Sequence, residues 1–448
     1  MTDHDVASRI ELFSGWIEAQ MAYLGLPALS LAIVHDQRLV CARGFGTATP
    51  ETLFRIASIT KLFTATAIMQ LRDAGRLRLD DAVTVHLPWF TVKTQHADAG
   101  AITIRHLLSH TSGLAREAAF PYWSNGQFPT WDAIRSRLPE HSQVLATDVQ
   151  WKYSNFALAL AGEVVSAVSG VPFDDYVRRR ILEPLGMQAT LVTTPAPDHP
   201  ALAPGYGRRM PDGTRARAPW TDAKAITAAA GMTTSVTDLA RFAMLQFRDG
   251  AAGDAVVRGT TLREMQRVHW LEPGWQKGWG LGFFIQRIRG KTYVGHGGSL
   301  RGYRTELRMC PADKLAVIVF TNADDGDPPK FIEKAFEWVA PAILRTSSAA
   351  PPLSPDPAWS RYVGRYRNAW GDLQVLVMDG ALMLIGPAVP DPMETASRLV
   401  PVGEHVFRVE TENGYGIAGE HVVFELDAAG RVRRLVTGDN YAEPVERW

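Results

Sequence analysis

The chain has 448 residues, 46% of them hydrophobic and 21% charged, a composition typical of globular proteins. Lys and Arg total 47, as do Asp and Glu, so no net charge favours binding to nucleic acid or to an anionic membrane. The only cysteines, Cys41 and Cys310, exclude a disulfide framework and a cysteine-based metal site.

The N-terminal region predicts a helix followed by a hairpin. The first residues, MTDHDVASRIELF, are acidic and lack the profile of a signal peptide, so we expect a cytoplasmic protein, or a periplasmic one if a leader has been removed. No apolar run approaches the roughly 18 residues of a membrane span. Apolar residues at helical spacing predict a helix over 7–24, and residues 28–46 predict two strands around a turn at 35–37.

The rest of the main domain predicts a helical middle and late strands. An apolar helix is expected within residues 54–71, and residues 101–275 are mostly helical and rich in loops. Strand patterns return late, and a helix follows them; their ranges are 280–288, 291–296, 302–309 and 315–322 for the strands and 329–344 for the helix. This order predicts an α+β fold, in which both chain ends close one antiparallel sheet flanked by helices and a helical lobe is inserted.

The sequence RTSSAAPPLSPDP is the best candidate for a domain boundary, because it is rich in Pro, Ser and Ala. We therefore predict a main domain over 1–345, a linker over 346–357 and a small domain over 358–448. The last segment contains short, evenly spaced strands separated by turns. This pattern predicts a small antiparallel β-barrel.

Ser58 and Lys61 form the only S-x-x-K sequence of the chain, at the start of the apolar helix. Residues three apart lie on one face of a helix, so the amine can reach the hydroxyl. A serine hydroxyl is a weak nucleophile that needs a neighbouring base. An amine is a base only when it is uncharged, and burial among apolar side chains lowers the pKa of a lysine. The pair is therefore a candidate for nucleophilic catalysis, although a chance match is a plain alternative.

Two further motifs follow in order: Tyr153-Ser154-Asn155 at the head of an apolar helix, and His296-Gly297-Gly298 just after a strand. With S-x-x-K, this order resembles the penicillin-recognising serine hydrolases, a family that includes class C β-lactamases, D-alanyl-D-alanine carboxypeptidases, D-aminopeptidases and family VIII esterases. Further segments that resemble this family are found through most of residues 25–325; they include ITIRHLLSHTSGL, ILEPLGM, GMTTSVTDLARF and HGGSLRGYRTELRM. The tail, beginning YVGRYR, resembles the lipocalin-like barrel of some members.

The resemblance implies a role for each motif residue. Ser58 would be the acylated nucleophile, with Lys61 and Tyr153 sharing the duties of general base and acid in an order left open. Asn155 would hold the amide carbonyl of the substrate. The other implied residues are His296 and Gly298 for substrate binding, and the backbone N–H groups of Ser58 and Ser299 for the oxyanion hole. We also expect the glycines to allow close approach of substrate to the backbone.

His296 departs from the Lys-Thr-Gly sequence usual in penicillin-active relatives. A histidine is mostly uncharged at neutral pH, so it would hold a substrate carboxylate poorly. We therefore expect an acyl-enzyme hydrolase of small amides or peptides, D-residue-specific by resemblance to the D-aminopeptidases, with weak or no β-lactamase activity. A carboxylesterase is the alternative within this class. A catalytically inactive binding or regulatory protein that keeps the fold is the alternative outside it.

Other motifs point to weaker hypotheses. His106 and His110 have the spacing of zinc ligands on a helix, but no Glu follows His106 and no third ligand is evident. Residues 414–419, GYGIAG, match a dinucleotide fingerprint but lack a following helix. We expect no metal and no cofactor. The expected partners are a small-molecule or short-peptide substrate and possibly further copies of the chain, with no nucleic acid.

Overall fold

The computed structural model describes residues 4–248, 256–347, 356–411 and 416–446. The chain divides into two compact units, one formed by Leu26–Ile332 and the other by Met1–Gly25 with Glu333–Trp448. We name them the sheet unit and the barrel unit. The predicted linker over 346–357 stays a prediction, since residues 348–355 lie outside the described ones.

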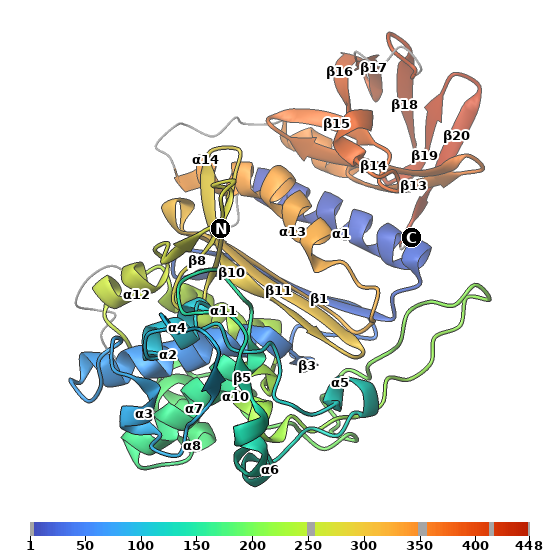
Figure 1. Ribbon diagram of the computed structural model, residues 1–448. Coiled ribbons are helices and arrows are strands. Elements are labelled where there is room, and N and C mark those ends of the chain that lie inside the picture. The colour runs from blue at the N-terminus through green and yellow to red at the C-terminus, as the bar shows by residue number, and fades with distance from the viewer. Residues whose placement is uncertain (1–3, 249–255, 348–355, 412–415, 447–448) are drawn as a thin grey trace. The chain divides into compact units, whose positions relative to one another are not determined.

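The sheet unit contains an eight-stranded antiparallel sheet, which confirms the predicted α+β fold (Figure 1). Its order is β2-β1-β12-β11-β10-β9-β8-β7. The strands are β1 (Ala28–His35), β2 (Arg38–Gly46), β7 (Trp270–Leu271), β8 (Lys277–Trp279), β9 (Phe284–Ile288), β10 (Lys291–Leu300), β11 (Tyr303–Cys310) and β12 (Leu315–Thr321). The first and last long strands are neighbours, with Leu29 opposite Thr321, so the sheet is closed by segments from both ends of this unit.

Helices of the sheet unit form the inserted lobe (Figure 1). They are α2 (Thr60–Asp73), α3 (Val83–His86), α4 (Ile104–Ser109), α5 (Tyr122–Asn125), α6 (Trp131–Arg137), α7 (Asn155–Ser169), α8 (Phe173–Val177), α9 (Glu183–Leu185), α10 (Thr227–Ala230), α11 (Val236–Leu245) and α12 (Gly259–Met265). α7 packs against α2 and α10. Gly162 permits this packing, because a Cβ there would lie 2.3 Å from the Cβ of Ala228. The close approach brings α10 to the side of α2 that carries Lys61.

The barrel unit contains a closed antiparallel barrel, as predicted. Its strands are β13 (Gly364–Asn368), β14 (Gly371–Met378), β15 (Ala381–Ile385), β16 (Ser397–Gly403), β17 (Val406–Glu410), β18 (His421–Leu426), β19 (Val432–Thr437) and β20 (Asn440–Val445). Aromatic rings fill the interior: Tyr362 stacks on Phe424 with ring centroids 4.5 Å apart, and Phe407 meets Phe424 at 5.6 Å. The inside of this barrel is therefore a packed core.

Helix α1 (His4–Leu24) packs on the outer face of β14. Leu12 of α1 lies in one cluster with Leu376 and Met378, while Val375 and Val377 face the barrel interior. A strand buried on both faces needs a continuous apolar run, which explains the sequence QVLVM in β14. The C-terminal helical segment, α13 (Pro328–Lys334), a π-helical turn (Ala335–Val339) and α14 (Ala340–Ser347), matches the predicted helix over 329–344.

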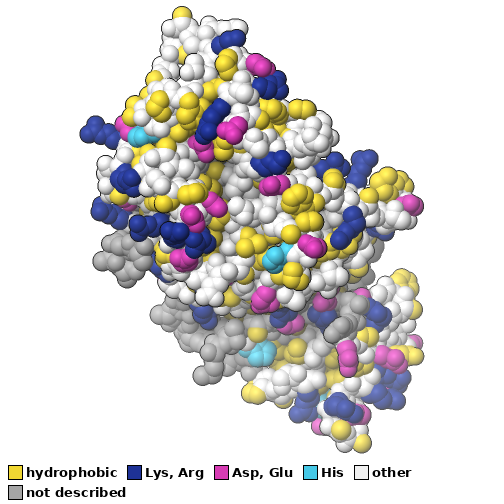
Figure 2. Space-filling model, turned by 90° about the horizontal axis from the view of Figure 1, so that it is seen from below, with side chains coloured by type: hydrophobic (Ala, Val, Ile, Leu, Met, Phe, Trp, Pro, Cys, Tyr) yellow, Lys and Arg dark blue, Asp and Glu magenta, His cyan; other side chains and the backbone are white. Residues whose placement is uncertain are grey.

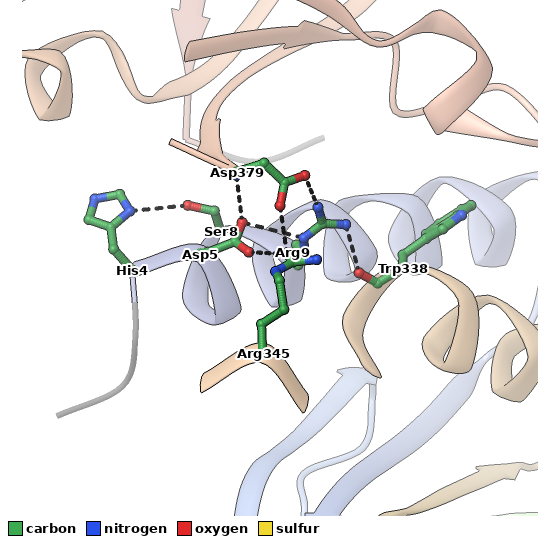
Figure 3. Close-up of polar contacts among 7 residues, drawn as sticks. All are labelled: His4, Asp5, Ser8, Arg9, Trp338, Arg345 and Asp379. Atoms are coloured by element: carbon green, nitrogen blue, oxygen red, sulfur yellow. Dashed lines mark hydrogen bonds and ion pairs between the residues drawn. The ribbon is translucent and has the colours of Figure 1, made fainter. Parts of the chain in front are cut away.

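A charged cluster ties α1, α14 and the β14–β15 turn together (Figure 3). The buried Arg9 donates to the Trp338 carbonyl at 2.9 Å and to Asp5 at 3.3 Å, and it also pairs with Asp379. Arg345 reaches the same two carboxylates at 2.7 and 2.6 Å, but its side chain is 52% exposed. Arg9 is therefore the member of the cluster whose charge is removed from solvent.

Acidic and basic side chains are interspersed on the face drawn in Figure 2, with apolar side chains between them. Among the described residues, no single helix has the length and apolar character to cross a membrane. One pair of helices, Asn155–Ser169 with Phe173–Leu185, passes that test only together and is bent by 78°.

Replacing Arg9 by Ala is expected to lower the free energy of unfolding of the barrel unit by about 2–3 kcal/mol, because it leaves the buried Trp338 carbonyl without its donor and removes the buried one of the two guanidinium groups that pair with Asp5 and Asp379. Arg345→Gln is the matched control, and it should cost less than about 1 kcal/mol because its pairs are solvent-screened. Urea unfolding followed by tryptophan fluorescence measures both. Equal losses for the two variants would contradict the special role of Arg9.

Candidate active site

Ser58 lies at the entrance of a continuous helical segment formed by the 3₁₀ turn Ala57–Ile59 and α2. The preceding residue, Ala57, has a φ of 47°, a conformation that costs energy for a residue with a Cβ. This turn presents the half-buried Ser58 hydroxyl at the head of the helix. Strained backbone next to a reactive side chain is a feature of catalytic sites.

Lys61 is fully buried one turn further on. Its Nζ lies 3.1 Å from Ser58 Oγ, 2.8 Å from Asn155 Oδ1 and 2.8 Å from the carbonyl oxygen of Ala229. Desolvation lowers the pKa of Lys61 well below its ordinary value, while the Glu117 carboxylate acts in the opposite direction. Burial thus moves this amine toward the uncharged form that a base requires.

Tyr153 reaches Ser58 from the segment before α7. Its hydroxyl donates to Ser58 Oγ at 2.8 Å, and its ring lies 4.9 Å from Lys61 Nζ. Desolvation raises the pKa of Tyr153, so the phenol keeps its proton at neutral pH. α7 is held in place by Ser154, whose side chain caps the helix through the Ala157 N–H at 2.9 Å.

The hydrogen-bond partners of Lys61 define the direction of proton transfer. Asn155 Oδ1 and the Ala229 carbonyl oxygen can only accept protons. A neutral amine has two protons, and donating both to these acceptors turns its lone pair toward Ser58 Oγ. The serine proton then points at the Lys61 lone pair, while the Tyr153 proton points at the serine oxygen.

His296 lies in the same cleft, with its ring centroid 6.1 Å from that of Tyr153. The expectation that His296-Gly297-Gly298 comes just after a strand is wrong, because β10 continues through Leu300 and pairs with β11 over its whole second half. Strand pairing in the sheet overrides the local tendency of two glycines to form a turn. Burial lowers the pKa of His296 to about 3, and a protonated Lys61 would act in the same direction.

The tautomer of His296 follows from its neighbour. Its Nδ1 lies 2.6 Å from the Gly297 carbonyl oxygen, which can only accept. The neutral ring therefore carries its proton on Nδ1 and offers Nε2 as an acceptor. Such a ring can accept a hydrogen bond from a substrate N–H or O–H but supplies no positive charge for a carboxylate.

Gly298 brings β10 against the turn that carries Ser58. A Cβ at Gly298 would lie 2.2 Å from both the Ile56 carbonyl oxygen and Thr305 Oγ1, whereas one at Gly297 would find its nearest neighbour at 3.8 Å. The glycine at 298 is thus required by packing within the chain, and the expected approach of a substrate to its backbone stays a prediction. β10 pairs with β9 only up to Gly295, so its edge from His296 to Leu300 has a partner strand on one side only.

The cleft has a volume of about 860 Å³. Its lining includes Ser58, Tyr153, Asn155, His296, Gly298 and Ser299, so the structure brings the predicted site residues together, with Lys61 bonded beneath Ser58. Two tryptophans, Trp123 and Trp151, also line the cleft, and Trp151 stacks on Trp279 with ring centroids 3.5 Å apart. Trp275 is 74% exposed and does not line it.

Glu117 is a site residue that the sequence analysis missed. Its Oε1 accepts from Asn155 Nδ2 at 2.8 Å, and its Oε2 accepts from the Tyr122 hydroxyl. Because a carboxylate can only accept, this contact fixes the Asn155 amide with its NH₂ toward Glu117 and its oxygen toward Lys61. The presence of an acidic residue in the largely apolar segment GLAREAAF could have marked Glu117 as unusual. No pattern in the neighbouring sequence, however, predicts its contact with Asn155.

His106 and His110 serve separate structural roles instead of facing one ion. His106 Nδ1 accepts from the Thr103 N–H at 3.2 Å, and its Nε2 lies 2.9 Å from Asp148. His110 Nδ1 accepts from the Ser154 N–H at 3.1 Å, and its ring packs on Tyr153 at 4.5 Å. Among the described residues, no group of three or more His, Cys, Asp or Glu side chains could hold a metal ion.

A serine flanked by a buried amine and a phenol, beneath the edge of an antiparallel sheet, is an arrangement suited to nucleophilic catalysis by serine. The family profile Beta-lactamase matches residues 13–340. The chain therefore belongs to the beta-lactamase family, the penicillin-recognising serine hydrolases.

Among curated proteins, the chain is similar to Penicillin-binding protein 4 of Amycolatopsis lactamdurans, with 28% identity over 74% of this chain and 90% of the relative. It is 24% identical to Beta-lactamase-like protein 2 of Dictyostelium discoideum over 89% of this chain and 78% of the relative. Both similarities extend beyond the motif segments.

Among solved structures, the octameric penicillin-binding protein homologue from Pyrococcus abyssi aligns with a TM-score of 0.64 and 25% identity, covering 97% of this chain and 99% of that one. The D-stereospecific amidohydrolase from Streptomyces sp. aligns with a TM-score of 0.61 and 24% identity over 74% of this chain and 98% of that one. The second likeness shows the fold alone.

Gly298→Ala is expected to force β10 away from the Ser58 turn. We expect a loss of at least about 2 kcal/mol in the free energy of unfolding, as for overpacked positions, and a fall in Ser58 labelling by a fluorophosphonate of about 100-fold. Gly297→Ala is the control, which should stay within about 1 kcal/mol because its Cβ would make only an ordinary van der Waals contact, at 3.8 Å from the Thr305 carbonyl oxygen. Urea unfolding and labelling kinetics test both, and a well-tolerated Gly298→Ala would refute the packing explanation.

Proposed function

We propose that this protein is a serine hydrolase that cleaves small amides or short peptides through an acyl-enzyme on Ser58, with substrates that contain a D-residue. The observation that supports this most directly is the aligned proton path from Tyr153 through Ser58 to Lys61, at 2.8 and 3.1 Å. The assignment of the oxyanion hole to the backbone N–H groups of Ser58 and Ser299, two residues that line the cleft, belongs to the same proposal.

In the proposed acylation, Ser58 Oγ attacks the substrate carbonyl carbon as its proton passes to the Lys61 amine. The oxyanion that forms is stabilised by the two backbone donors. When the C–N bond breaks, Tyr153 gives its proton to the departing amine, and Lys61 returns a proton to Tyr153. Lys61 is placed as the first acceptor because its pKa is lowered, whereas that of Tyr153 is raised. Water then hydrolyses the acyl-enzyme.

Amide cleavage is favoured over ester cleavage because an amine leaving group must be protonated, and Tyr153 is a protonated phenol 2.8 Å from the nucleophile. We expect β-lactamase activity to be weak, because the neutral His296 supplies no cation for the carboxylate of a penicillin. Penicillin-binding protein 4, at 28% identity, supports the wider substrate class. D-stereospecificity rests on the resemblance of the His-x-Gly motif to that of the D-aminopeptidases.

The function is tested by trapping and by substrate comparison. We expect a fluorophosphonate to add to Ser58, as mapped by peptide mass spectrometry, and no adduct with Ser58→Ala. D-alanyl p-nitroanilide should be cleaved at least about tenfold faster than its L-isomer, while a chromogenic cephalosporin should be turned over slowly. Cleavage of p-nitrophenyl acetate alone would favour the carboxylesterase alternative. No adduct under any condition would favour an inactive binding protein.

Glu117→Gln tests the electrostatics of the site. The Glu117 carboxylate raises the pKa of Lys61, so its removal lowers that pKa further and leaves the amine uncharged at lower pH. The acidic limb of the kcat/KM profile is therefore expected to move to lower pH. Tyr122→Phe is the control, because it removes a hydrogen bond to Glu117 but keeps the charge. An acidic limb that moves upward or stays unchanged would contradict the assignment of Lys61 as the base.

The remaining expectations stay proposals. A cytoplasmic location, or a periplasmic one, stays a proposal. Self-association is proposed by analogy with the Pyrococcus abyssi homologue, which is octameric; sedimentation velocity of the full chain tests it.

A further inference from the structure

A second cavity of about 580 Å³ adjoins the active-site cleft. The two share Trp123, Ser299 and Arg304 in their linings, so they form one continuous depression. The new cavity lies beyond Ser299, on the side away from His296. Its charged lining residues are Arg208, Arg301, Arg304, Asp324 and Asp325.

The acidic residues of this cavity are already engaged. Asp324 accepts from the Gly302 N–H at 2.7 Å and lies 3.6 Å from Arg304. Asp325 accepts from the Arg209 N–H at 2.9 Å and from Arg215 Nη1 at 2.5 Å. Both carboxylates thus stabilise the walls of the cavity.

Two arginines of the lining are free. Arg208 and Arg301 are exposed and have no hydrogen-bond or ion-pair partner among the described residues. Arg301 occupies the tip of the tight turn between β10 and β11, where Leu300 pairs with Tyr303. Since Asp324 holds the N–H of the next residue, Gly302, the backbone that carries Arg301 is fixed. The Arg304 guanidinium, in contrast, already donates to the Leu300 and Tyr303 carbonyl oxygens.

The position of this cavity indicates that it would hold the acyl half of the substrate, the part that is transferred to Ser58. The leaving group departs beside its proton donor, Tyr153, whose ring is 6.1 Å from that of His296. The acyl half must then run the other way along the edge of β10, past Ser299 toward Arg301. At about 3.3 Å per residue, the backbone of Arg301 lies roughly 7 Å beyond that of Ser299.

We propose that Arg301 and Arg208 form a subsite for a carboxylate carried by the acyl half of the substrate. This inference rests on the proposed function and adds to it a substrate class, acidic acyl groups. Guanidinium groups suit the task because their forked donors bind a carboxylate through charge-assisted hydrogen bonds. The cleft would thus bind a carboxylate at the end that holds the acyl half. At the other end, beside the neutral His296, the leaving group would need no negative charge.

The test compares two p-nitrophenyl esters that differ only at the acyl terminus, the hydrogen adipate and the hexanoate, with uncatalysed hydrolysis subtracted. Activated esters report acylation of Ser58 whatever the natural leaving group is. We expect the full-length protein to prefer the adipate at least about tenfold in kcat/KM, and 0.5 M NaCl to reduce this preference. Arg301→Gln and Arg208→Gln should each reduce it about three- to fivefold and leave the hexanoate rate within twofold.

Two further variants act as controls. Arg301→Lys keeps a charge and should retain part of the preference. Arg217→Gln removes an equally exposed arginine that stacks on Tyr206 and does not line this cavity, so it should change nothing.

Three outcomes would overturn the proposal. Equal kcat/KM values for the two esters would refute the proposed carboxylate subsite, but they would not contradict the proposal that Ser58 is the nucleophile of a hydrolase. If Arg301→Gln altered the use of an acidic leaving group, as in 4-acyloxy-3-nitrobenzoates, instead of an acidic acyl group, the assignment to the acyl half would be wrong. If neither ester were turned over and no fluorophosphonate adduct formed, the hydrolase function itself would fail, and the subsite with it.

Discussion

The proposed active site depends on the burial of one amine, Lys61, next to one hydroxyl, Ser58. Lys61 is enclosed by protein and faces two oxygens that can only accept its protons, so its lone pair is left for Ser58. A buried ammonium without a full counter-charge is costly, so burial lowers the pKa of Lys61 and favours the uncharged amine. The pKa shift that makes Lys61 a base is thus a direct consequence of its burial.

The same enclosure explains the neighbouring residues. Asn155 is useful only if its oxygen faces Lys61, and the Glu117 carboxylate enforces that orientation. Glu117 also opposes the loss of charge on the amine, so the working pKa of Lys61 is a balance between desolvation and one nearby carboxylate. His296, buried by the same packing, is held neutral and is suited to accept a hydrogen bond.

Sheet register places these groups relative to the substrate. β10 can approach the Ser58 turn because Gly298 has no side chain, and among the described strands its pairing with β9 ends at Gly295. The turn at the end of that strand carries Arg301 into the adjoining cavity. One strand therefore carries His296, the Ser299 backbone and, in the turn at its end, Arg301, whereas Arg208 reaches the same cavity from a separate segment.

The sequence alone determined the α+β architecture, the barrel and the Ser58–Lys61 pair, because these follow from local periodicity and from two residues one helical turn apart. It also supplied Tyr153, Asn155 and His296, but only through resemblance to a family, since no local rule joins residues so distant along the chain. Tertiary structure decided the rest. Glu117 and the Ala229 carbonyl act through contacts between separate segments, Gly298 is required by a backbone that lies 242 residues earlier in the chain, and the His-Gly-Gly segment became a strand because its neighbour in the sheet supplied the hydrogen bonds that an isolated peptide lacks.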